Sequence, residues 1–185
     1  TTASLPLAFL GESYTAELKA TAGSDGTLSW KVTQGTLPTG LSLNENTGAL
    51  SGTVPGDATM QPISLTFQVT ETLGGGVTRT AEITLILTVT KRLAITNEPT
   101  NFTLARGAAF SLTLTANLDN VNWSRESGSL PSNLNLTGNT ISGTVSAYAR
   151  DGEYTYTVTA CSQDGQTAEQ TFTFILGSLF YFTLP

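Results

Sequence analysis

The side chains that most often carry enzyme chemistry are scarce in this sequence. It contains no histidine and a single cysteine, Cys161. Without histidine there is no imidazole to act as a general base, to activate a serine or to bind a metal ion. One cysteine can form neither an intramolecular disulfide nor a thiolate zinc site. The inventory argues against an enzyme, and we predict that Cys161 is a small, partly buried thiol.

Carboxylates remain as groups that could bind a cofactor, and calcium is the cofactor they suit. A calcium ion takes about six to eight oxygen ligands, several of them usually carboxylates. Asp151 and Glu153 flank Gly152, and Asp164 lies in a turn between glutamines. These acids are the candidate ligands of a loop site, although an Asp-Gly pair is more often part of a simple hairpin turn.

Three aromatic residues are candidates for contact with a ligand. Tyr148 is the clearest aromatic residue in a loop, and Trp30 and Trp123 could stack on a sugar ring. Both tryptophans, however, lie between polar neighbours in strand-like segments, where a large side chain normally points into the core. We therefore expect both indoles to be buried, with Trp→Ala at either costing about 3–5 kcal/mol of stability.

Charge and hydropathy argue against two classes of partner. The sequence has 8 basic and 14 acidic residues, a net charge of −6, and only 12% charged residues. A sparse negative charge is unsuited to phosphate backbones, so we predict no nucleic-acid binding. The sequence has no basic amphipathic stretch and no apolar run of membrane-spanning length, which predicts no direct membrane insertion. The lack of paired cysteines favours a bacterial origin.

The elements that position these residues occur twice. Segment 35–43 reads GTLPTGLSL and segment 128–136 reads GSLPSNLNL, and LSGTV at 50–54 is matched by ISGTV at 141–145. Trp30 and Trp123 hold the same place ahead of these segments. Short apolar and threonine-rich stretches separated by turn residues predict about seven strands per copy, as in a β-sandwich. We predict two tandem all-β domains, residues 1–91 and 92–185.

The best matched segment implies a particular backbone. Two residues after a shared proline, the first copy has Gly40 and the second has Asn133. Glycine and asparagine both tolerate a positive φ, so this position should carry one. Gly52 and Gly143 interrupt strand-like runs, which indicates a bulge or a close approach of another backbone.

The last strand of each copy should turn one face to the core. In the first copy every second residue is apolar: Ile83, Leu85, Leu87 and Val89. Matching 84–87 with 173–176, and 67–69 with 156–158, places Ile175 at the same position as Ile86, on the outer face. A repeated outward isoleucine indicates either contact with a neighbouring loop or module, or an ordinary exposed side chain.

On these segments, the chain resembles the Putative Ig (He_PIG-type) modules of bacterial surface proteins, a cadherin-like group related to the dystroglycan-type cadherin-like domain. The resemblance is carried by Leu-Pro-x-Gly-Leu-x-Leu and Thr-Gly-x-Leu-x-Gly-Thr within 37–53, and by the opening residues 1–6 with Gly11 and Tyr14. It covers nearly the whole chain, and the second copy departs from it at Asn133 and at 137–140. It implies two immunoglobulin-like sandwiches in an extracellular or cell-surface protein.

Two features concern the ends of the copies. The cadherin-like resemblance implies calcium at the junction, but here the junction has Lys91, Arg92 and a single acid, Glu98. The linker, residues 90–96, has no glycine or serine run, which predicts a semi-rigid connection. Within the tail 177–185, residues 179–185 echo 93–99, and we expect either the start of a further repeat or an added strand.

The sequence leaves two functions open. The tandem copies and the stiff linker favour a non-catalytic module of a bacterial secreted or cell-surface protein, acting in adhesion or as a structural spacer. The alternative is a ligand-binding module attached to a secreted enzyme or surface receptor. It would bind carbohydrate, or bind its ligand in a calcium-dependent way. The expected partners are a protein or polysaccharide at a cell surface and further repeats of the parent chain.

Overall fold

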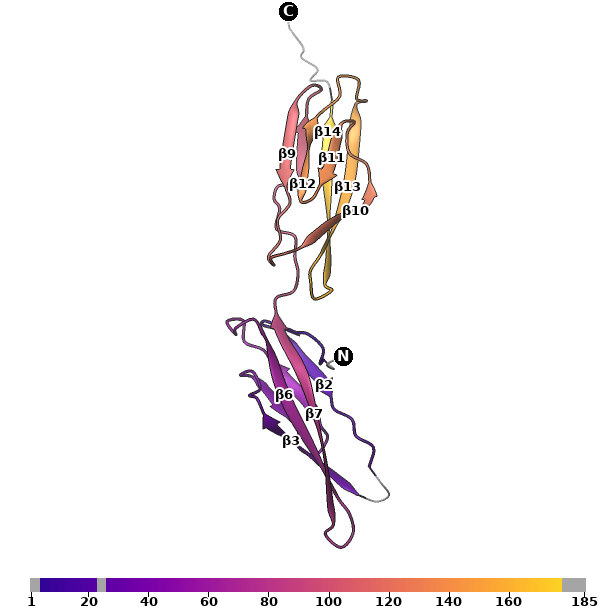
Figure 1. The fold of residues 1–185 in the computed structure, drawn as a ribbon. Helices are drawn as coiled ribbons and strands as arrows, with labels where there is room; N and C mark the ends of the chain where they lie inside the picture. Colours follow the sequence, from indigo (N-terminus) through magenta and orange to yellow (C-terminus); the bar gives the residue numbers. More distant parts are fainter. Residues whose placement is uncertain (1–3, 23–25, 178–185) are drawn as a thin grey trace, which may run out of the picture. The chain divides into compact units, whose positions relative to one another are not determined.

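The chain folds into two β-rich units, drawn in Figure 1. The computed structural model describes residues 4–22 and 26–177, and this part of the chain contains strands but no helix that could cross a membrane. Residue contacts divide the chain into units 1–92 and 93–185. Arg92 belongs with the first unit because its guanidinium binds the Glu12 carboxylate and lies 4.3 Å from the ring centre of Phe9. Residues 1–3 of the opening segment, and 178–185 of the tail, lie outside the described residues.

Unit 1 is a sandwich of two sheets, in the orders β1-β7-β6-β3 and β2-β5-β4. The first strand, β1, runs parallel to β7, and the other neighbours are antiparallel. Its strands are β1 (Ala8–Phe9), β2 (Ser13–Glu17), β3 (Thr27–Gln34), β4 (Leu41–Leu43), β5 (Ala49–Thr53), β6 (Gln61–Thr72) and β7 (Thr78–Thr90).

Unit 2 repeats this arrangement, in the orders β10-β13-β14-β8 and β11-β12-β9. Here β8 is the strand that pairs in parallel, with β14. Its strands are β8 (Asn101–Leu104), β9 (Ala109–Thr113), β10 (Asn122–Gly128), β11 (Leu134–Thr137), β12 (Thr140–Thr144), β13 (Gly152–Cys161) and β14 (Thr167–Leu176). The all-β, two-sandwich fold expected from the repeat is confirmed.

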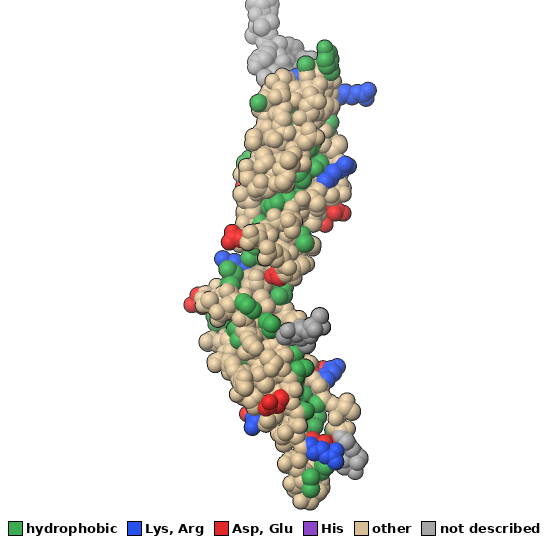
Figure 2. Space-filling view, viewed as in Figure 1, with side chains coloured by type: hydrophobic (Ala, Val, Ile, Leu, Met, Phe, Trp, Pro, Cys, Tyr) green, Lys and Arg blue, Asp and Glu red, His purple; other side chains and the backbone are tan. Residues whose placement is uncertain are grey.

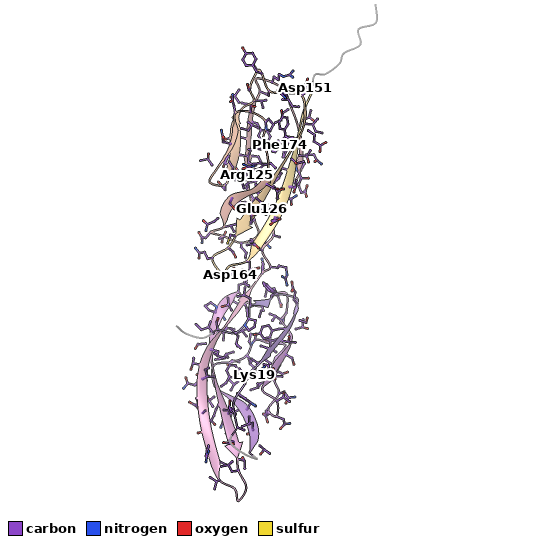
Figure 3. The ribbon with its side chains drawn as sticks, turned by 90° about the vertical axis from the view of Figure 1, so that its right-hand side faces the viewer. Lys19, Arg125, Glu126, Asp151, Asp164 and Phe174 are labelled. Carbon is purple, nitrogen blue, oxygen red and sulfur yellow. The ribbon has the colours of Figure 1, made fainter. Side chains whose placement is uncertain are left out.

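Each unit has its own hydrophobic core between its two sheets. In unit 1 the core includes Leu50, Leu65 and Phe67, all of them 1% exposed or less. In unit 2 it centres on phenylalanines, and the rings of Phe102 and Phe174 stack with their centres 5.5 Å apart. Figure 3 shows Phe174 inside the second sandwich. These cores follow from the two-residue alternation of apolar side chains along the strands.

The predicted backbone of the signature segment is confirmed in both units. Gly40 has a φ of 86° and Asn133 a φ of 74°. The carbonyl of this positive-φ residue comes so close to the next strand that only glycine fits at the strand position it faces. A Cβ on Gly52 would lie 1.9 Å from the Gly40 oxygen, and one on Gly143 would lie 2.0 Å from the Asn133 oxygen.

The strand pairing corrects the matching of the last strands. Ala8 pairs with Val89, and its counterpart Leu104 pairs with Leu176, so Val89 and Leu176 are equivalent. Ile175 therefore corresponds to Thr88, and the prediction that Ile86 and Ile175 share a position is wrong. The sequence match was shifted by two residues, a shift that leaves every side chain on its own face and so is not visible in the alternation.

The outer ends of the strands also differ from expectation. Ile83 was predicted to face the core, but its side chain is 47% exposed. β7 has 13 residues whereas β2 on the opposite sheet has 5, and every residue of β7 before Leu85 is exposed. Ile86 is half-buried where the N-terminal segment passes, with Leu5 N–H donating to its carbonyl at 2.9 Å. Ile175 is 45% exposed.

Candidate functional site

The two matched tryptophans have different surroundings. Trp30 pairs with Val69 and Trp123 with Ala160, and each precedes a β-bulge in the edge strand of its sheet. Trp30 is 6% exposed, as expected, whereas Trp123 is only half-buried. Both indoles pack against the core of their unit, as expected, but the burial of Trp123 is only partial.

A turn covers Trp30 in unit 1. The turn joins β4 to β5, and its Glu45 carbonyl accepts a hydrogen bond from the backbone N–H of Trp30 at 2.7 Å. Further along the turn, Gly48 is buried, and a Cβ at this glycine would lie 2.9 Å from the indole Cε2. The indole can pack on this backbone only because glycine has no side chain.

The corresponding turn of unit 2 is shorter. Residues 44–49 of unit 1 are matched by 137–140 in unit 2. Asn139 takes the place of Gly48, since their carbonyls accept the N–H groups of the equivalent residues Leu114 and Leu18. Its side chain turns back, with Nδ2 donating to the Leu114 carbonyl at 3.4 Å. The shorter turn and the larger residue leave Trp123 without the cover that Trp30 has.

A recess of about 440 Å³ opens beside Trp123. Its wall is formed by the indole, the loop that leads into β10 and the β11–β12 turn. The polar residues along it are Asp119, Asn120, Asn122 and Asn139. Asn122 precedes Trp123 in β10, so its side chain points to the other face of the sheet. Asn120 has a φ of 54°, a conformation that asparagine tolerates better than most residues, and this reversal shapes the loop. The recess is of the size typical of small-molecule sites, about 300–1,000 Å³.

The predicted calcium ligands are not brought together. Asp151 and Glu153 lie at the start of β13, and Asp164 lies in the turn after its end. Since a strand rises about 3.3 Å per residue, Asp151 and Asp164 are about 30 Å apart, and Figure 3 shows them at opposite ends of unit 2. Across residues 4–22 and 26–177, no three acidic or cysteine side chains gather at one metal-sized site.

Two of these acids already have partners. Asp151 Oδ1 lies 2.7 Å from Arg106 Nη2. Asp164 accepts hydrogen bonds from the Ser162 hydroxyl and, at 2.9 Å, from the Gln166 amide. Burial alone would raise the pKa of Asp164, but these hydrogen bonds and those from backbone N–H groups outweigh it and lower the pKa. Both carboxylates thus stabilise local structure in unit 2.

Tyr148 is placed as a loop residue should be. Its side chain is 95% exposed, on a turn in which its N–H donates to the Ser146 hydroxyl at 3.2 Å. The position suits contact with a large partner, although the ring stands alone on the surface. Cys161 is half-buried.

The surface around these features carries little charge. Figure 2 shows isolated acidic and basic side chains separated by wide areas of uncharged surface. The uncharged area reflects the sequence, in which charged residues are only 12%. Contacts to a partner would therefore rely on hydroxyl, amide and aromatic groups more than on ion pairs.

Two facing sheets, with the first strand parallel to the last, define each unit as an immunoglobulin-like β-sandwich. Residues 1–90 and 93–177 each match the family model described as "Putative Ig domain", and the chain belongs to this family. A search among curated proteins found no match.

The chain is also similar to parts of larger solved structures. Immunoglobulin domains 1–4 of Sidekick-1 match 96% of this chain and 48% of their own, at 15% identity and a TM-score of 0.51. Drosophila N-cadherin EC1-4 matches 95% of this chain and 49% of its own, at 16% identity and a TM-score of 0.45. An endo-fucoidan hydrolase of glycoside hydrolase family 107 matches 95% of this chain and 28% of its own, at 20% identity and a TM-score of 0.37. The chain spans less than two thirds of each of these structures.

Proposed function

We propose that this chain is a non-catalytic tandem module of a bacterial secreted or cell-surface protein, in which it acts in adhesion or as a structural spacer. The observation that carries the proposal is repetition. Two complete sandwiches of one family follow each other, each with its own core. Repeated modules add length and present a binding surface at a distance from an anchor, a use that needs no catalytic group.

The chemistry of the chain supports this role. Histidine is absent from the sequence. Of the acids predicted to bind calcium, Asp151 and Glu153 lie at the start of β13 and Asp164 lies beyond its end, so calcium is not part of the proposal. The partners we propose are a protein or polysaccharide at a cell surface and further repeats of the same parent chain.

A second function is favoured by one observation, the recess beside Trp123. A module that binds a ligand, attached to a secreted enzyme or surface receptor, would need such a feature, and a spacer would not. Trp30 is 6% exposed where Trp123 is half-buried, so an accessible tryptophan at this position is not a requirement of the fold.

Surface display tests the adhesive or spacer role. The chain is inserted between a membrane anchor and a terminal epitope tag on a non-adherent bacterial strain. We expect the tag to become more accessible to antibody than in a strain without the insert, and adhesion to extracellular matrix or polysaccharide coatings if the role is adhesive. Unchanged tag access together with no adhesion would contradict the proposal.

A further inference from the structure

We propose that the recess beside Trp123 binds a neutral sugar residue of a polysaccharide. The inference rests on the second function proposed above, a ligand-binding module, and names its ligand; the spacer role needs no ligand at this position. It starts from the difference between the repeats, in which the same tryptophan is covered in unit 1 and open in unit 2.

The half-buried indole supplies an apolar surface in a polar setting. Its packed side touches the core of unit 2, which holds the ring in place. The C–H groups of a pyranose ring can cover the part of an indole that is left open, and this burial of apolar area drives association. In unit 1 this surface is already covered by the turn that contains Gly48.

The side chains around the indole can bind hydroxyl groups. An asparagine amide both donates and accepts hydrogen bonds, and a carboxylate accepts two or more, so they match the vicinal hydroxyls of a sugar. Within the described part of the chain, the side chains of Asp119 and Asn120 have no hydrogen-bond partner. Asn139 is held by the Leu114 carbonyl and accepts the Thr140 hydroxyl at 3.3 Å. Asp119 and Asn120 are thus available to a ligand, and Asn139 fixes the rim.

The charge of the lining selects a neutral ligand. The recess contains one carboxylate and neither lysine nor arginine, and the chain as a whole carries −6. A uronic acid or sulfated sugar would meet repulsion without a compensating cation. A peptide could also stack on the indole, but it would not offer vicinal hydroxyls to Asp119 and Asn120.

NMR titration of the full chain tests the site, because the two tryptophans give separate indole N–H signals. Trp30→Phe assigns them. The probes are cellotetraose, mannotetraose, xylotetraose and galactotetraose, with tetragalacturonate as the anionic probe and a tetraglycine peptide as the peptide probe. We expect at least one neutral tetrasaccharide to shift the Trp123 signal and not the Trp30 signal, with a dissociation constant of about 1 mM or tighter.

Substitutions then locate the contact. Asp119→Ala and Asn120→Gly, which keeps the positive φ, should each weaken the binding about tenfold, or about 1.4 kcal/mol. Asn46→Ala, an exposed asparagine of the matching turn in unit 1, is the control and should leave it unchanged. Replacing residues 137–140 with the longer turn 44–49 should cover Trp123 and abolish binding, while the amide spectrum shows that unit 2 stays folded.

Several results would overturn the inference. They are the absence of a Trp123 shift with every neutral probe, equal shifts of both tryptophans, preference for tetragalacturonate or tetraglycine, and undiminished binding by the turn replacement. Tag accessibility in the display assay does not depend on this recess, so failure of the sugar site is distinguishable from failure of the spacer role.

Discussion

At the residue scale, the two repeats differ most at the position shared by Gly48 and Asn139. The glycine lets an indole rest on the backbone of a neighbouring turn, with a Cβ position only 2.9 Å from the ring. The asparagine is exposed and bonded to Leu114 instead. One residue type, together with a shorter turn, separates a structural tryptophan from one that is open to ligands.

Substitution of the two tryptophans should therefore have unequal effects. Trp30→Ala removes a side chain that is 6% exposed and should cost about 3–5 kcal/mol of stability. Trp123→Ala removes a half-buried one and should cost about 1–2 kcal/mol, because less area leaves the core. Guanidinium unfolding of the full chain, followed by NMR signals from each unit, measures both. Equal losses would show that the indoles are equally packed.

Tyr14 should make unit 1 sensitive to alkali. Its side chain is 4% exposed, its hydroxyl donates to the Pro6 carbonyl at 3.3 Å, and burial raises its pKa to about 12 from 10.0. Between these values the unfolded chain loses the phenol proton and the folded chain keeps it. The free energy of unfolding should therefore fall as pH rises from 10 to 12.

Tyr14→Phe is the matched variant, since it keeps the ring and removes the ionisable group. Its unfolding free energy should fall less steeply over the same pH range, by chemical denaturation at fixed temperature. The lysines titrate in both proteins and so cancel in the comparison. Parallel curves would mean that the phenol ionises in the folded state as easily as in the unfolded one.

At the scale of elements, the β4–β5 and β11–β12 pairs depend on glycines that allow two backbones to meet. In unit 1 the Gly40 carbonyl lies against the backbone of Gly52 in the next strand. In unit 2 the Asn133 carbonyl lies against Gly143 in the same way. Threonine and leucine patterning forms the strands, but these glycines allow the small sheet to close against its own turn.

Gly52→Ala should destabilise unit 1 by about 2–4 kcal/mol, because the added methyl would overlap the Gly40 carbonyl and the φ of 145° disfavours alanine. Gly56→Ala, in the same unit with open space around the position, is the control and should change stability by less than about 1 kcal/mol. Thermal unfolding monitored by circular dichroism compares them. A similar loss for both would argue that the close approach is not required.

At the scale of the whole molecule, the chain is two copies of one sandwich that differ in their loops. The β6–β7 hairpin is longer than β13–β14, and the turn beside the tryptophan is longer in unit 1. Such differences leave the cores intact because loops contribute little to them. They provide the variety that a repeated module needs to acquire a binding site in one copy.

Calcium should not stabilise this chain. Asp151 is paired with Arg106 and Asp164 with Ser162 and Gln166, at opposite ends of β13. We expect thermal unfolding midpoints in calcium and in chelator to agree within about 1 °C, since a ligand that does not bind the folded state cannot shift them. A calcium-dependent rise that Asp151→Asn removes would place an ion at the start of β13.

The sequence alone determined the fold class, the repeat, the positive φ at Gly40 and Asn133 and the close approach at Gly52 and Gly143. These follow from local chemistry, because glycine, proline and the two-residue alternation act through the backbone of their own segment. The tertiary structure decided the two-residue register of the last strands, the exposure of Ile83 and Trp123, and the separation of Asp151 from Asp164. Those properties depend on which distant segment lies against a residue, and in unit 2 a shortened turn left Trp123 partly uncovered.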